Sequence, residues 1–231
     1  MIKVENVDVW GFEHAIRGMR NPLNSWDKSD SEEMFWCDAL APNEEPHYCN
    51  HCGYDMCYPY YGEPEYVVGP NDLDLMQRLY KAGTEHRKYL RQIFVSMDIT
   101  APLYWWKEFD TYKVGTVANS CSTMHKIAAK EFELDDFSHE HMGEELGCLR
   151  NVVNQLNLFR NNYIESNKDK RFWWQMIQLL PSSYNQKRTI TMNYENVITM
   201  IKQRTGHKLD EWLDFISELC KLPYVKSLFN I

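Results

Sequence analysis

The sequence predicts a mixed α/β (α+β) fold, in which short strands alternate with longer helices. Residues 93–99 alternate apolar and polar side chains, which is the period of a half-buried strand. Residues 143–166 instead repeat apolar side chains at every third or fourth position, which is the period of an amphipathic helix. A chain of 231 residues can bury a sizeable core and usually forms one domain, so we expect a single domain over residues 1–231.

The other expected elements follow from the same two periods and from cap and turn residues. Asn71-Asp72 is a typical helix cap and Gly83 a typical helix stop, so we expect a helix between them. Pro102 suits the first turn of a short helix that ends near Asp110. In chain order, the remaining expectations are a strand at 2–9, a helix at 170–180, a strand at 188–193, a helix at 195–204 and a helix starting at Asp210.

Charge and hydropathy argue against several classes of protein. The formal net charge is −8, which argues against a general nucleic-acid binder. No run approaches the roughly 18 apolar residues of a membrane span, and the N-terminal residues lack the apolar stretch of a secretory signal. The number of cysteines, 7, is odd and fits a chain with reduced thiols. We therefore expect a cytoplasmic protein that does not bind a membrane.

Residues 34–70 differ from the rest of the chain, because they are rich in proline and hold four of the cysteines. These are Cys37, Cys49, Cys52 and Cys57, and the C-x-x-C spacing of the middle pair lets two thiolates bind one tetrahedral zinc. His47 or His51 can replace one thiolate. A structural zinc would fold this insert without a core of its own. Free or buried thiols and a redox pair stay open as alternatives.

Two segments carry distinctive motifs. In the run from Ile93 to Lys126, a strand ends in the pair Ala101-Pro102, and an aromatic helix and a polar loop follow it. The second segment has a Leu-Pro pair, a Thr-x-Asn strand end and a helix ending in an arginine, here Leu180-Pro181, Thr191-Met192-Asn193 and Arg204. Both segments resemble the signature regions of flavin-dependent thymidylate synthases. The resemblance covers about residues 71–230 and leaves out the insert.

The resemblance implies a flavin-dependent thymidylate synthase-like fold, a homotetramer with sites between subunits, and transfer of a one-carbon unit to the uracil ring of dUMP. FAD, NADPH and methylenetetrahydrofolate would take part. It also implies that Arg204 is catalytic and contacts the pyrimidine, because an arginine there stabilises negative charge on the ring. The implied flavin-binding residues are Asn193, Lys113, Asn119 and Thr116, and the implied nucleotide-binding residues are Ser120, Cys121 and Ser122.

Other interpretations of the same residues stay open. The family's Arg-His-Arg triplet falls on Thr111, Tyr112 and Lys113, and a further family arginine falls on Ile177. These differences favour, as an alternative, a non-catalytic or repurposed nucleotide- or flavin-binding protein on the same fold. A zinc-containing interaction module in the insert is another alternative. By themselves, Arg204 is also a favourable residue at a helix C-terminus and Asn193 a favourable turn residue.

Overall fold

The computed structural model describes residues 2–34, 36–37, 58–59 and 65–230. Most of the insert, with Cys49, Cys52 and Cys57, lies outside the described residues. The chain divides into two compact units, one formed by residues 1–9 and 94–226 and the other by residues 10–93 and 227–231. The single domain expected over residues 1–231 stays a prediction.

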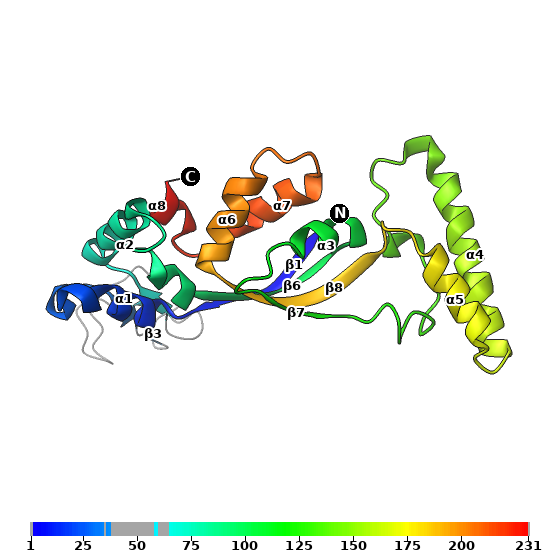
Figure 1. Ribbon diagram of the computed structural model, residues 1–231, viewed down its shortest axis with the longest axis horizontal. Helices are drawn as coiled ribbons and strands as arrows, with labels where there is room; N and C mark the ends of the chain where they lie inside the picture. The colour runs from blue at the N-terminus through cyan, green and yellow to red at the C-terminus, as the bar shows by residue number, and fades with distance from the viewer. Residues whose placement is uncertain (1, 35, 38–57, 60–64, 231) are drawn as a thin grey trace. The chain divides into compact units, whose positions relative to one another are not determined.

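A four-stranded sheet with the strand order β1-β6-β8-β7 is the framework of the first unit (Figure 1). The strands are β1 (Lys3–Trp10), β6 (Phe94–Pro102), β7 (Val117–Ser120) and β8 (Asn185–Asn193). β8 pairs antiparallel with β6 along its whole length, from Asn193 opposite Phe94 to Asn185 opposite Pro102. It also pairs antiparallel with β7, where Arg188 lies opposite Ser120. The sheet therefore places the two segments that carry the resemblance side by side.

Alternating burial along β6 shows which face of the sheet is covered. Val95, Met97 and Ile99 are at most 1% exposed, whereas the side chains between them are half-buried. Three helices lie on one side of the strands, namely α3 (Leu103–Phe109), α6 (Tyr194–Arg204) and α7 (Asp210–Leu219) (Figure 1). The alternation expected from the sequence thus divides β6 into a core face and a polar face.

An aromatic core joins α3 to α7. Trp105 and Trp106 of α3 are 0% exposed, and so are Trp212 and Phe215 of α7. The ring centres of Trp105 and Trp212 lie 4.8 Å apart, and those of Trp105 and Phe215 lie 5.3 Å apart. Because each such ring removes roughly 150–250 Å² from water, this cluster fixes the position of α3 and of the turn that follows it.

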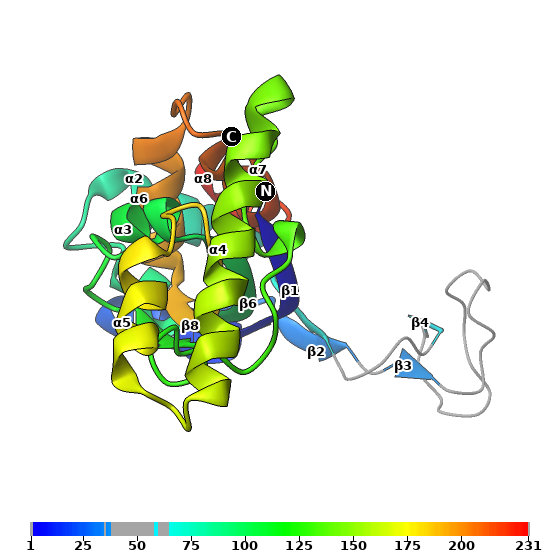
Figure 2. The ribbon, with the colours of Figure 1, turned by 90° about the vertical axis from the view of Figure 1, so that its right-hand side faces the viewer.

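Two further helices of this unit have an apolar core of their own. α4 (Leu146–Glu165) and α5 (Lys170–Leu179) lie side by side, as Figures 1 and 2 show, and the short helices η4 (Leu134–Asp136) and η5 (Gly143–Glu145) precede them. The turn between α4 and α5 holds Asn167 and Lys168 in the left-handed region, with φ of 57° and 69°. The buried side chains of this core are Ile127, Phe132, Phe137, Leu149, Val153, Leu156 and Met176.

The described part of the second unit contains helices and short strands. Its helices are α1 (Phe12–Arg20), η1 (Asn21–Leu23), η2 (Trp26–Lys28), α2 (Pro70–Ala82) and η3 (Lys88–Gln92). β2 (Glu32–Met34) pairs antiparallel with β5 (Glu65–Val67), and β3 (Trp36–Cys37) pairs parallel with β4 (Tyr58–Pro59). The last helix of the chain is α8 (Val225–Phe229). Its Phe229 packs edge-on against Tyr80 of α2, with the ring centres 4.9 Å apart.

A buried ion pair connects the helices of the second unit. The Asp72 carboxylate is 0% exposed and accepts a 2.6 Å hydrogen bond from Nε of Arg20. It also accepts hydrogen bonds from the hydroxyls of Ser29 and Ser31, each at 2.7 Å. Burial acts to raise the pKa of Asp72, but the hydrogen bonds from Ser31, Ser29 and Arg20 outweigh it and hold this pKa below its ordinary value. The charged carboxylate therefore connects α1, α2 and the segment between them.

Most expected elements are confirmed, with small shifts at their ends. α4 begins at Leu146 rather than at residue 143, and Pro102 is the N-cap of α3 rather than its first helical residue. Several elements were not expected from the sequence, namely the helices α1 and α8, the strand β7 and the short strands β2, β3, β4 and β5. Among the described residues, no helix is both long and apolar enough to cross a membrane.

Candidate functional site

Arg204, the expected catalytic residue, is the last residue of α6 and lies in a network of polar side chains. Its Nη1 donates a 2.7 Å hydrogen bond to Oε2 of Glu108 on α3, and its Nε donates one of 2.9 Å to the hydroxyl of Tyr112. Nε2 of His207 lies 3.1 Å from Nη1. Glu108 also accepts a 2.9 Å hydrogen bond from Nε1 of Trp212. These contacts fix the guanidinium in one orientation.

Aromatic rings also contact this guanidinium. Cζ of Arg204 lies 4.6 Å from the ring centre of Trp212 and 5.6 Å from that of Tyr112. A guanidinium stacked on aromatic rings gains cation–π attraction and keeps its charge. Within the part of the chain that the structure describes, its third nitrogen, Nη2, donates no hydrogen bond. Because the side chain is 18% exposed, Nη2 is the nitrogen that remains for a ligand.

Asn193 ends β8 and caps α6. Its Oδ1 accepts a 3.1 Å hydrogen bond from the backbone N–H of Asn196, and Oδ1 of Asn196 accepts one of 3.3 Å in return. Nδ2 of Asn196 donates a 2.7 Å hydrogen bond to the carbonyl of Val114, in the turn after α3. Gly115 in this turn has a φ of +78°, and a Cβ there would lie 2.7 Å from Nδ2 of Asn193. The predicted residues Asn193 and Arg204 therefore both contact the segment that follows α3.

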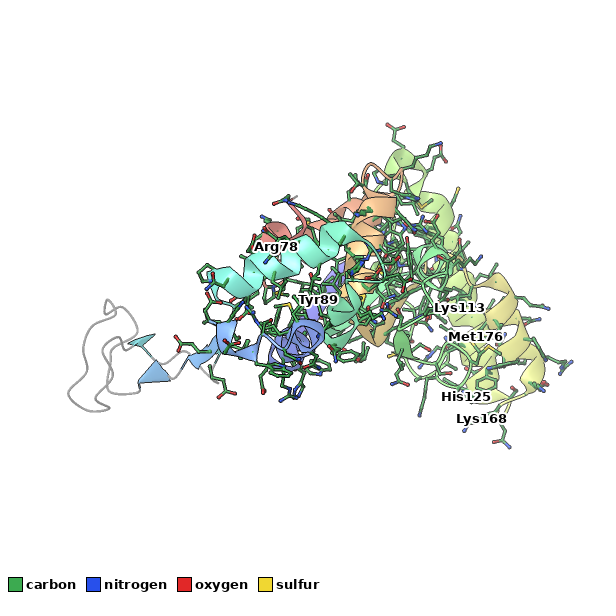
Figure 3. All side chains as sticks on the ribbon, turned by 60° about the vertical axis from the view of Figure 1, so that its left-hand side comes forward. Arg78, Tyr89, Lys113, His125, Lys168 and Met176 are labelled. Carbon is green, nitrogen blue, oxygen red and sulfur yellow. The ribbon has the colours of Figure 1, made fainter. Side chains whose placement is uncertain are left out.

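A cavity of about 260 Å³ lies between the end of α3 and β7, and we call it the α3–β7 cavity. Two predicted flavin-binding residues line it, Lys113 and Thr116. Figure 3 labels Lys113, whose side chain is exposed. The hydroxyl of Thr116 is buried and, among the described residues, has no hydrogen-bond partner. Asp110 also lines the cavity, but its carboxylate is paired with Nη1 of Arg188 at 2.7 Å.

A second cavity, of about 250 Å³, lies at the end of β7 and is lined by the predicted nucleotide-binding residues Cys121 and Ser122. The hydroxyl of Ser122 accepts a 3.0 Å hydrogen bond from the backbone N–H of His125, and it lies 3.0 Å from Nδ1 of the same residue. Tyr184 also lines this cavity, and burial, followed by the charge of Asp136, raises its pKa. The hydroxyl of Ser122 is therefore already used in a local turn.

The other two predicted residues, Asn119 and Ser120, lie on β7 between the two cavities, and both are exposed. In the sheet they stand opposite Thr189 and Arg188 of β8. The structure thus distributes the predicted polar residues along one strand and both of its ends. Their assignment to flavin or nucleotide stays a prediction.

Sequence reasoning missed the side chains that surround these residues. Glu108 holds Arg204 but lies 96 residues away from it in the chain. Arg188 stacks on the ring of Trp106, with Cζ 4.2 Å from the ring centre. The sequence could have singled out Arg188, because it is an arginine within a β-branched strand. The partners of Arg188 follow only from the register of β8. No local pattern indicates the roles of Glu108 or His207.

The predicted zinc site cannot be placed in the described residues. Cys49, Cys52 and Cys57 lie outside them, and only the backbone of Cys37 is described, in β3. Among the described residues, no group of three or more His, Cys, Asp or Glu side chains is arranged to hold a metal ion. The zinc site stays a prediction about the insert.

The fold is similar to that of flavin-dependent thymidylate synthase. A crystal structure of thymidylate synthase X (ThyX) from Helicobacter pylori with FAD and dUMP matches with a TM-score of 0.67 and 14% identity, over 98% of this chain and 97% of that one. Another structure of ThyX from Helicobacter pylori, complexed with FAD and dUMP, matches with a TM-score of 0.66 and 16% identity, over 97% and 96% of the two chains. No family model and no curated protein matches the sequence. The resemblance expected from the sequence is confirmed for the fold.

Proposed function

We propose that this protein binds a flavin and a pyrimidine deoxynucleotide, and that it transfers a one-carbon unit to the uracil ring of dUMP or a close variant. Reduced FAD would be the reductant, NADPH would reduce it, and methylenetetrahydrofolate would be the carbon donor. The observation that supports this proposal is the environment of Arg204. A fixed, stacked guanidinium keeps one nitrogen for a ligand, on a fold shared over nearly the whole chain with a protein that holds FAD and dUMP.

The residues around the α3–β7 cavity fit part of a flavin nucleotide. Lys113 offers a cation and Thr116 a buried hydroxyl without a described partner, and both are donors that suit phosphate oxygens. The cavity of about 260 Å³ is smaller than the roughly 300–1,000 Å³ typical of complete small-molecule sites. We therefore propose that one chain supplies part of the site and that the rest comes from a neighbouring subunit of the homotetramer that the resemblance implies. When bound, FAD would supply the hydride; Lys113, Thr116, Asn119 and Asn193 would hold it.

The chain's own contribution to the reaction is position and charge. Nη2 of Arg204 would donate a hydrogen bond to a carbonyl oxygen of the pyrimidine and stabilise the negative charge that develops on the ring. Glu108 and Tyr112 would keep the guanidinium in the orientation that exposes Nη2. Ser120, Cys121 and Ser122 would contact the nucleotide.

The test combines a spectrum with an assay of product. Purified protein is mixed with FAD, and the visible spectrum and the amount of dTMP formed from dUMP, methylenetetrahydrofolate and NADPH are measured. We expect a flavin spectrum and dTMP, and we expect Arg204→Ala to lower kcat about 10²–10³-fold, as loss of a charge-stabilising donor does. Arg150→Ala, a change at an exposed arginine of α4, is the matched control and should keep full activity. Soluble wild-type protein without flavin binding or dTMP formation would refute the proposal.

A second candidate is a non-catalytic or repurposed nucleotide- or flavin-binding protein on the same fold. The ion pair between Arg204 and Glu108 favours it, because a carboxylate 2.7 Å from Nη1 offsets charge that the transition state would use. This candidate predicts binding of dUMP or FAD without formation of dTMP. Complementation of a thymidine auxotroph separates the two, since growth requires product. The interaction module expected in the insert predicts that deletion of residues 34–70 abolishes partner binding but leaves nucleotide binding intact.

A further inference from the structure

A cavity of about 600 Å³ lies in the second unit, and none of the residues predicted to bind flavin or nucleotide line it. Its walls come from α1, η2, α2 and the segment between the first two, all within residues 10–93. The volume falls inside the roughly 300–1,000 Å³ that is usual for small-molecule sites. The side chains at this cavity determine which class of ligand it suits.

Arg20 is a buried cation at this cavity. Its side chain is 5% exposed, its Nε donates to Asp72 at 2.6 Å, and its Nη1 donates to the carbonyl of Ser25 at 3.1 Å. In the described part of the chain, Nη2 of Arg20 donates no hydrogen bond, although the residue lines the cavity. Two fixed nitrogens hold the guanidinium plane, so the third is a preorganised donor.

Two more cations line the cavity from different elements. Lys28 of η2 is exposed and is paired with no carboxylate among the residues described. Arg78 of α2, labelled in Figure 3, forms an ion pair with Asp74 at 2.8 Å, and both side chains are more than 60% exposed, at 66% and 63%. Because an exposed ion pair of this kind is weak, Arg78 is free to turn towards a ligand.

Among the side chains that line the cavity, Arg20, Lys28 and Arg78 are cationic and only Asp74 is a carboxylate. Arg20 is paired with Asp72 behind the cavity, and Arg78 with Asp74. The carboxylate of Asp30 does not line the cavity and accepts hydrogen bonds from the backbone N–H groups of Asn71 and Asp72 at the start of α2. Three cationic donors from three elements, with the amide of Asn71 beside them, suit an anion with several oxygens.

We propose that this cavity binds a small organic phosphate. The phosphate would accept hydrogen bonds from Nη2 of Arg20 and from Lys28 and Arg78, which line the cavity from three different helices. The volume is much larger than one phosphate ion requires, and the buried Leu75 gives the rest of the ligand an apolar wall. The site is independent of Arg204 and of the proposed function.

Isothermal titration calorimetry with ribose 5-phosphate, ribose and inorganic phosphate tests this proposal. We expect ribose 5-phosphate to bind one molecule per chain, inorganic phosphate to bind more weakly, and ribose to give no heat. The double change Lys28→Ala, Arg78→Ala should weaken binding of ribose 5-phosphate by about tenfold or more, because it removes two of the three cationic donors. Both side chains are exposed, so the fold should be retained, and a thermal unfolding scan checks this.

Two control variants make the test specific. Lys81→Ala removes an exposed lysine of α2 that does not line the cavity, and it should bind ribose 5-phosphate as the wild type does. Arg204→Ala should also leave this binding unchanged, which separates the cavity from the proposed reaction. Equal binding by the double variant and the wild type would overturn the proposal. Absence of binding at millimolar ribose 5-phosphate, or displacement by equimolar acetate, would overturn it as well.

Discussion

Replacing Asp72 by asparagine tests whether the buried ion pair holds the second unit together. The change keeps the shape of the side chain but removes its charge. The carboxylate accepts five hydrogen bonds, from Nε of Arg20, the hydroxyls of Ser29 and Ser31 and the backbone N–H groups of Asp30 and Ser31. An amide oxygen cannot replace both carboxylate oxygens, so donors on one side lose their acceptor.

The expected cost follows from burial of both partners. The side chains of Arg20 and Asp72 are 5% and 0% exposed, so Asp72→Asn leaves a guanidinium without a counter-charge away from water. Removing one partner of a buried pair typically costs about 3–5 kcal/mol. Since whole domains are stable by only about 5–15 kcal/mol, the variant should unfold at a much lower urea concentration.

Urea denaturation followed by tryptophan fluorescence measures this loss, and Asp74→Asn is the matched control. Asp74 lies on the same helix and pairs with Arg78, but both side chains are exposed, so its loss should cost about 1 kcal/mol or less. Adding Arg20→Met to Asp72→Asn should recover part of the stability, because no unpaired charge then remains. If the two single variants unfold at the same urea concentration, the buried pair does not have the importance assigned to it here.

The same pair predicts a pH dependence. The pKa of Asp72 is lower in the folded chain than its ordinary value of 3.8, so the folded chain binds the proton less tightly than the unfolded one. Its contribution to stability is therefore complete above the unfolded-state pKa and is lost as pH falls through the folded-state pKa. The difference in unfolding free energy between wild type and Asp72→Asn should shrink on acidification below about pH 4. A difference that grows in acid would contradict this sign.

Two further changes test the segment that contacts Asn193. Gly115→Ala should lower the free energy of unfolding, measured by urea titration, by about 1–3 kcal/mol, because φ is +78° and the added Cβ would lie 2.7 Å from Nδ2 of Asn193. Gly143→Ala, at φ +51° with nothing within 4 Å, is the control and should cost less; an equal cost would exclude the steric part of this argument. Asn193→Ala should lower the free energy of unfolding by about 1 kcal/mol, because it removes the side-chain cap of α6. Asn193→Asp keeps a capping oxygen and should lower it less; equal losses for the two variants would refute the capping role.

The sequence predicted the elements that carry strong local signals. β8 and α6 follow from a β-branched run that ends in Asn193, which is both a strand end and a helix cap. β6 follows from strict alternation, because one of its faces packs on helices. Where burial repeats with the period of an element, the pattern is visible in the sequence.

The missed elements lack signals of this strength. The signal of α1 is weak rather than absent: Phe12, Ala15, Ile16 and Met19 recur with helical spacing, but the helix has only 9 residues and its N-cap Gly11 has no side chain to mark its start. β7 is exposed along its whole length and exists because β8 offers it hydrogen-bond partners. The partners of Arg204 depend on the packing of α3 against α6 and α7, which no short window of sequence contains.

The separate apolar core of α4 and α5 has a practical consequence for labelling the protein. The tip of this hairpin, at Asn167 and Lys168, already uses left-handed backbone, which glycine adopts without strain. An epitope or fluorophore sequence flanked by glycines should therefore be accepted there without disturbing the sheet or the surroundings of Arg204. Such a tagged chain would make ligand binding and assembly measurable in mixtures with untagged copies.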